Sequence, residues 1–363
     1  MWALILKEFR QVRRDHRTLA MMIALPVMML IVFGYAASFD VDEVSAVVIG
    51  PGADAAAQRL PDAFDVIGTH VIGGRERAVQ ALRDGEAVAA FVTGADPQVL
   101  IDGSELFAAR RAMQVLSAAA AGPGPGDPVS GVAAGAAPEV LFNPELKTSV
   151  IMIPAIAGMI LVFIGVMITS LGVVRERQAG TLEQLAVMPF SPTDVFVGKI
   201  APYFLVASVD LAVVLAVGVW LFDVPFNGSV LVLGLGALLF LFVTLGLGVL
   251  ISTVSANQGQ AIQLSLMVLI PQVLLSGMIF PIESMAAGIR WISYLLPLRY
   301  FIEISRPVMI RGAGLAAVWQ PMALLADMGL VIFGLSIIRF RRDLAPSGRA
   351  RRRTRLPAAG QES

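Results

Sequence analysis

The segment Ser149–Val174 has the sequence SVIMIPAIAGMILVFIGVMITSLGVV and contains no charged side chain. A helix needs about 20 mostly apolar residues to cross a bilayer, so this segment is long enough to span a membrane with some tilt. Five other segments share its apolar character, and two of these carry a single charge: Leu19–Ser38, Ile200–Phe222 (with Asp210), Val230–Ile251, Ala261–Phe280 and Met322–Ile338 (with Asp327). We therefore predict a mainly α-helical, polytopic membrane protein with six spans.

The composition of the whole chain supports this fold class and excludes several others. Of its 363 residues, 57% are hydrophobic and 15% are charged, whereas soluble domains average about 45–50% and about 25%. The formal net charge of +0 gives no indication of a nucleic-acid partner. Cysteine is absent, which excludes disulfides, thiolate metal sites and cysteine nucleophiles. Of the two histidines, His70 has no second ligand at a metal-site spacing, so we predict neither a metal site nor a bound cofactor.

Basic side chains are concentrated at the two ends of the chain, in the leader 1–18 and the tail 339–363. Lys and Arg in short flanks stay on the cytoplasmic side of a membrane. The pattern therefore predicts that both termini are cytoplasmic and that segments 39–148, 223–229 and 282–317 lie on the opposite side. With these assignments the inner segments are net positive and the outer segments net negative.

The leader is predicted to be an amphipathic elbow helix on the membrane surface. Its apolar residues form one stripe, and its basic residues lie on the other face, where they can meet lipid headgroups: Trp2, Ile5, Leu6, Phe9 and Val12 against Lys7, Arg10, Arg14 and Arg17. The apolar run that follows, 19–38, exceeds the roughly 7–15 residues of a signal-peptide core. We therefore predict an uncleaved first span.

Residues 39–148 differ from the rest in charge and in glycine and proline content, and they predict a small α/β domain. The expected strands are Val44–Ile49, Val66–Ile72, Ala87–Val92 and Gln98–Ile101, and the expected helices are Ala53–Leu60, Arg75–Asp84 and a Ser104-capped helix through Ala121. Two interpretations stay open. The domain is either a platform for substrate or partner, or a rigid spacer or dimerisation element.

Between the second and third spans, the sequence predicts a short, separately capped helix at about 181–188. Gly180 can end the preceding helix, Thr181 and Gln184 form a capping box, and Pro189 ends the new helix. Leu182, Leu185, Ala186 and Met188 supply an apolar side, and Glu183 with Gln184 a polar one. An ordinary helical connection is the alternative interpretation.

These residues resemble the cytoplasmic motif of the type-2 ABC transporter permeases, the membrane subunits of ATP-driven exporters. The resemblance rests on Arg175–Leu185 (RERQAGTLEQL) and, in the same order along almost the whole chain, on further segments: Lys7–Phe9, Arg13–Asp15, Leu100–Ser104 (LIDGS), Phe142–Glu145 (FNPE), Leu275–Met285 (LSGMIFPIESM), Tyr294–Leu298 and Tyr300–Phe301. The chain is most similar to the branch with a large outer domain, typified by bacterial multidrug exporter permeases. Asp210 and the long Arg-rich tail depart from the family pattern.

The resemblance implies roles for particular segments. The short cytoplasmic helix would couple the permease to an ATPase subunit, with Glu183 as its polar anchor. The coupling residues would be Gly180, Thr181, Leu182, Glu183, Gln184, Leu185, Met188 and Pro189. Within a transmembrane domain at 149–338, the outer segment 282–317 would form re-entrant half-helices, and Ser276, Gly277, Pro281 and Glu283 would lie along the pathway. Arg299, Glu303 and Arg306 have helical spacing and are expected to neutralise each other.

The resemblance also implies partners and a location. These are a cytoplasmic ABC ATPase that holds ATP and Mg, a second permease that is identical or paralogous, and the lipids of a bacterial inner membrane. The chain has no phosphate-binding loop of its own, because the Gly198-Lys199 pair has Thr193 at the required glycine position and Ile200 after it. We therefore expect a transporter permease rather than an enzyme, exporting hydrophobic or amphipathic compounds.

Two charged residues within spans keep other function classes open, because an intramembrane carboxylate is a candidate functional group. Asp210 and Asp327 would serve a proton-coupled secondary transporter, or an intramembrane aspartyl protease if they were close enough to share a proton. Asp327 is near the predicted start of its span, which favours a position beside water. Gly158, Gly165 and Gly172 recur every seven residues and predict close helix packing.

Overall fold

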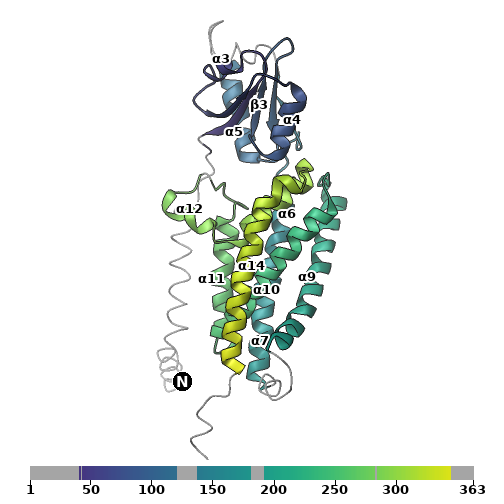
Figure 1. Ribbon diagram of the computed structural model, residues 1–363, viewed down its shortest axis with the longest axis vertical. Coiled ribbons are helices and arrows are strands. Elements are labelled where there is room, and N and C mark those ends of the chain that lie inside the picture. The colour runs from purple at the N-terminus through teal and green to yellow at the C-terminus, as the bar shows by residue number, and fades with distance from the viewer. Residues whose placement is uncertain (1–40, 42, 121–136, 181–191, 283, 345–363) are drawn as a thin grey trace, which may run out of the picture.

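The computed structural model describes residues 41, 43–120, 137–180, 192–282 and 284–344. They form a sheet domain and a helical bundle, and Figure 1 shows the sheet domain beyond one end of the bundle. The predicted elbow helix, first span and coupling helix lie outside the described residues, as do residues 345–363 of the predicted tail.

The sheet domain confirms the predicted α/β class. Its five strands are ordered β2-β1-β3-β4-β5: β1 Val44–Ile49, β2 Phe64–His70, β3 Ala89–Val92, β4 Gln98–Asp102 and β5 Glu139–Leu141. Only the β3–β4 pair is antiparallel. Helices α3 (Ala53–Ala57) and α5 (Leu106–Ala120) cover one face, and α4 (Arg75–Asp84) covers the other. Both faces are therefore buried, which explains why β1, β3 and β4 are nearly continuous apolar runs.

Most strand and helix positions in this domain agree with the sequence patterns. β1 and α4 have the predicted bounds. β2 both begins and ends two residues earlier than predicted, and Val71 and Ile72 are 62% and 90% exposed. The sequence did not predict β5. This strand has only three residues and pairs with β4 across a long connection, so it is too short to show periodicity.

Five described helices are long and apolar enough to cross a membrane, and they coincide with five of the six predicted spans. The first is continuous through α6 (Thr148–Val162), the π-helical η2 (Phe163–Ile168) and α7 (Thr169–Gln178). The others lie in α9 (Pro192–Phe222), α10 (Val230–Val254), α11 (Gln258–Leu275) and α14 (Leu315–Leu344).

Two span ends differ from the prediction. α11 stops at Leu275 instead of Phe280, because Gly277 adopts φ +81°, a left-handed conformation that does not continue a helix. α14 begins at Leu315, before the polar Gln320 and Pro321 that delayed the predicted start to Met322. Asp327 is thus twelve residues into α14, about 18 Å along its axis. The prediction places it five residues after the start of a span at Met322, so its depth depends on where the membrane begins along α14.

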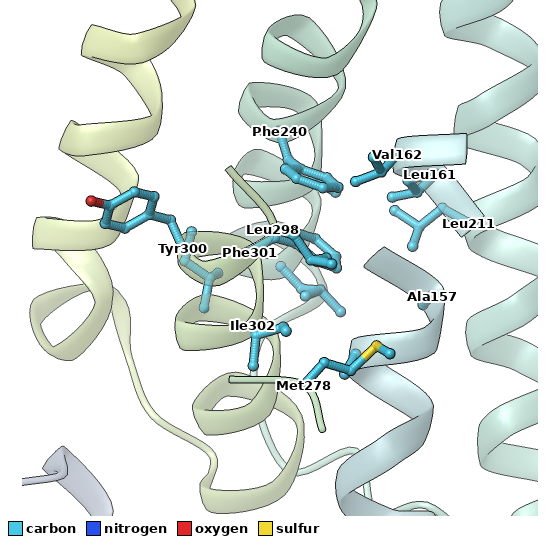
Figure 2. Packing of buried hydrophobic residues seen from close by; sticks show 14 of the residues in the cluster. Ala157, Leu161, Val162, Leu211, Phe240, Met278, Leu298, Tyr300, Phe301 and Ile302 are labelled. Carbon is cyan, nitrogen blue, oxygen red and sulfur yellow. The ribbon is translucent and has the colours of Figure 1, made fainter. Parts of the chain in front are cut away.

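The bundle core is centred on a short helix, α13 (Pro297–Arg306), which follows α12 (Ala287–Ser293) and precedes the π-helical η3 (Pro307–Arg311). Phe301 of α13 stacks on Phe240 of α10 with ring centroids 4.7 Å apart (Figure 2). A Cβ at Gly158 would lie 2.6 Å from both Leu298 and Phe301, so α13 approaches α6 closely only because this residue is glycine. The segment 282–317 therefore contains short helices, as the resemblance implied, and α13 is largely buried.

Candidate functional site

The junction between the sheet domain and the bundle is built around a buried ion pair. Asp102 ends β4, and its Oδ1 accepts a hydrogen bond from the Ser104 N–H at 2.8 Å. Arg311, the last residue of η3, donates from Nη1 to Asp102 Oδ2 at 3.0 Å. The Asp102 side chain is fully buried and that of Arg311 is 10% exposed. Burial raises the pKa of the Asp102 carboxyl, while Arg311 and Ser104 favour its charged form.

Two sequence motifs that were noted separately meet at this junction. Asn143, of the FNPE segment, donates from Nδ2 to the carbonyls of Gly103 and Lys147, both at 3.2 Å, and accepts from the Lys147 N–H. Gly103 belongs to the LIDGS segment, and a Cβ on it would lie 2.7 Å from the Asn143 carbonyl oxygen. The contact between these motifs fixes the start of α6 against the end of β4.

A second set of polar contacts lies where α11 ends, near several predicted pathway residues. Arg306 donates from Nη2 to the Gly277 carbonyl at 3.1 Å and from Nε to that of Ile151 at 3.4 Å, tying α13 to α6 and to the α11 end. The predicted Arg299–Glu303 pair is confirmed at 2.7 Å. Arg306 is also predicted to help neutralise Glu303, and that role stays a prediction beside its two hydrogen bonds to backbone carbonyls.

Some polar groups of the other residues in this region have hydrogen-bond partners and others do not. Gln272 Oε1 accepts from the Leu298 N–H at 3.2 Å, but its buried Nε2 and the buried Ser276 Oγ have no hydrogen-bond partner in the part of the chain that is described. Pro281 accepts at its carbonyl from Ser284 Oγ at 2.8 Å. Glu283 lies outside the described residues. Ser276 and Gly277 are thus adjacent to the α11–α13 contact.

The two intramembrane carboxylates do not form a pair. Asp327 is exposed on α14, whereas Asp210 is partly buried on α9, and its buried Oδ2 has no hydrogen-bond partner among the described residues. No hydrogen bond among the described residues joins them. This arrangement gives no support to a dyad that shares one proton.

An apolar cavity of about 680 Å³ lies between α9 and α10, within the range typical of small-molecule sites. The hydroxyl of Ser208 is already bonded to the Phe204 carbonyl at 2.8 Å. The other lining residues are apolar: Leu211, Ala212, Leu215, Ala216, Val219, Phe226, Val230, Leu233, Gly234, Ala237, Leu238 and Leu241. The cavity is therefore suited to hydrocarbon rather than to a charged solute.

At the opposite end of the bundle, the α10–α11 loop lies beside the end of α7. Arg177 donates to the Ser255 carbonyl at 3.1 Å, and Gln258 donates to Gln178 at 2.9 Å. Asn257 caps α11 by accepting from the Gln260 N–H. Gly180 follows α7 with φ +72°, as its predicted helix-ending role requires. No prediction from the sequence covers this loop, although Asn257 and Gln260 have capping-box spacing.

Together these features define a membrane protein in which, among the described residues, a sheet domain precedes a bundle that contains five apolar helices long enough to span a bilayer. The chain belongs to the ABC-2 family of transporter proteins, whose family model matches residues 16–338. It is therefore the membrane component of an ABC transporter, its permease.

Several curated relatives are named as permeases. The probable multidrug ABC transporter permease YbhS of Escherichia coli K12 is 28% identical over 377 residues, covering 94% of this chain and 97% of that protein. YbhR of the same strain, also named a probable multidrug ABC transporter permease, is 35% identical over 182 residues, covering 50% of this chain and 49% of YbhR. The inner membrane transport permease YhhJ of that strain is 33% identical over 212 residues, covering 56% of this chain and 54% of YhhJ. The chain thus spans about half the length of YbhR and YhhJ and nearly all of YbhS.

Proposed function

We propose that this permease exports hydrophobic or amphipathic compounds, using ATP hydrolysed by a separate ATPase subunit. The apolar cavity between α9 and α10 carries the proposal, because its lining favours hydrocarbon over ions or sugars. The names of YbhR and YbhS, which describe multidrug permeases, agree with this substrate class.

The partner proposals follow from family membership. A cytoplasmic ABC ATPase would supply ATP and Mg, and a second permease, identical or paralogous, would complete the pathway. The ATPase would dock on the segment 181–188, which follows α7 in the sequence, and Arg177, Gln178 and the α10–α11 loop form the end of the bundle that precedes it. The basic leader and tail favour a cytoplasmic location for this end, in a bacterial inner membrane.

Transport of a hydrophobic dye in inverted vesicles, with the ATPase subunit co-expressed, is expected to require ATP and to persist in Asp210→Asn and Asp327→Asn. Neutral amides keep the side-chain shape but cannot carry protons. The measurement is dye accumulation with ATP, and separately with an imposed pH gradient. Accumulation driven by the pH gradient alone and abolished by Asp210→Asn would instead establish the proton-coupled alternative.

Replacing Glu183 with alanine is expected to lower co-purification of the ATPase several-fold, because the coupling helix loses its charged anchor. Membrane insertion should be unchanged, since the residue is outside the predicted spans. Glu362→Ala, in the predicted cytoplasmic tail, is the matched control. Equal recovery of ATPase with both variants would show that Glu183 is not the anchor.

A further inference from the structure

A polar hollow of about 620 Å³ lies where the sheet domain meets the beginning of α14. One side is formed by the end of α4 and the residues after it, with Gln80, Arg83, Asp84 and Glu86. The other side is formed by Trp319 and Gln320 in the first turns of α14, together with small residues before them. Figure 1 shows this domain boundary, with α4 on the sheet-domain side. The transport proposal above does not use this hollow.

The charged side chains around the hollow differ in whether they have partners within the protein. Glu86 pairs with Arg77 at 2.9 Å, and Gln80 donates to Asp84 Oδ2 at 2.6 Å. Arg83 is exposed and has no hydrogen bond or ion pair with any other described residue. The hollow therefore offers a guanidinium with five unused donors, next to a carboxylate that still has acceptor capacity.

The position of the hollow relative to the membrane follows from α14. This helix begins at Leu315 and is a candidate span from its first residue. Leu315 and Trp319 are 51% and 57% exposed, and tryptophan at the end of a span is typical of the headgroup level of a bilayer. The hollow is thus at the depth where phosphate and amine groups of lipids lie, in the leaflet on the sheet-domain side.

We propose that this hollow binds the headgroup of a phospholipid bearing a primary amine. The lipid phosphate would bind Arg83, since guanidinium groups suit phosphate oxygens. The ammonium group would bind Asp84, and the Trp319 ring would lie against the glycerol and upper acyl carbons. Because the hollow joins α4 to α14, the bound lipid would bridge the two domains.

The test is native mass spectrometry of the full-length protein purified in detergent, with phosphatidylethanolamine or phosphatidylglycerol added. Wild type is expected to retain phosphatidylethanolamine at least fivefold better than phosphatidylglycerol. Arg83→Gln should reduce phosphatidylethanolamine retention at least fivefold, and Asp84→Asn should remove the preference between the two lipids. Arg59→Gln, another exposed arginine of the sheet domain, is the matched control and should retain lipid like the wild type.

Two results would overturn the proposal. Equal retention by wild type and Arg83→Gln would show that the phosphate is not bound there. Equal retention of both lipids by wild type would remove the amine assignment. Both variants replace exposed side chains, so an unchanged melting temperature is expected and would exclude misfolding as the cause of lipid loss. ATP-driven dye transport is scored separately, so failure of either proposal is visible independently.

Discussion

Replacing Asp102 with alanine is expected to lower the free energy of unfolding by about 3–5 kcal/mol, because it leaves Arg311 buried without its counter-charge. The Arg311 guanidinium is only 10% exposed and cannot release its proton. Arg311→Met should cost less, since the Asp102 carboxyl, whose pKa burial already raises, can take up a proton instead. Denaturant titration in detergent micelles measures both changes.

The matched control for this pair is Arg75→Gln, which breaks the exposed Arg75–Glu139 ion pair. Those side chains are 44% and 49% exposed, so solvent screens the pair and the expected loss is below about 1 kcal/mol. If Asp102→Ala cost no more than Arg75→Gln, the junction would not depend on the buried pair. A double-mutant cycle at Asp102 and Arg311 gives their coupling directly.

Replacing Gly248 with alanine is expected to destabilise the bundle by about 1–3 kcal/mol, the usual cost of overpacking a core. The added Cβ would lie 2.4 Å from the Gly165 carbonyl oxygen and 2.9 Å from Thr169 Cβ. The first of these is a backbone atom of η2, so no side-chain rotation relieves the clash and α10 must move away. Thermal unfolding monitored by helical circular dichroism measures the change.

Gly234→Ala is the control for this prediction, because it adds the same methyl group to the same helix where no atom lies within 4 Å. Alanine is the better helix former, so no loss of stability is expected there. A melting temperature for Gly248→Ala that matches Gly234→Ala would show that α10 and η2 are not held at the distance described.

The sequence alone predicted the elements whose signal is local. Ser149–Val174 and Val230–Ile251 are uncharged over a bilayer's width. β1 ends before a glycine and α4 has a glycine at each end, so the positions of these elements needed no tertiary information. The glycine spacing on the second span also predicted close packing, which is confirmed at Gly158 and Gly165. Glu283 and the predicted coupling residues after Gly180 stay predictions, because 181–189 and 283 lie outside the described residues.

Features that depend on residues far apart in the sequence were harder to predict from the sequence. The last span is predicted to begin at Met322, whereas α14 begins at Leu315. A hydropathy pattern penalises Gln320, although a helix can continue through one polar turn at the membrane surface. Arg306, besides its helical spacing from Glu303, donates hydrogen bonds to carbonyls 29 and 155 residues away. Linear spacing cannot indicate such contacts.

By itself, the sequence determined that this protein is a membrane protein with an inserted α/β domain, because hydropathy over about 20 residues and strand–helix alternation are local properties. Only the tertiary structure decided that the LIDGS and FNPE motifs meet Arg311 at one junction and that Arg83 and Trp319 border one hollow. These associations join residues up to 236 positions apart. They arise from how two domains pack, a property that no single stretch of sequence encodes.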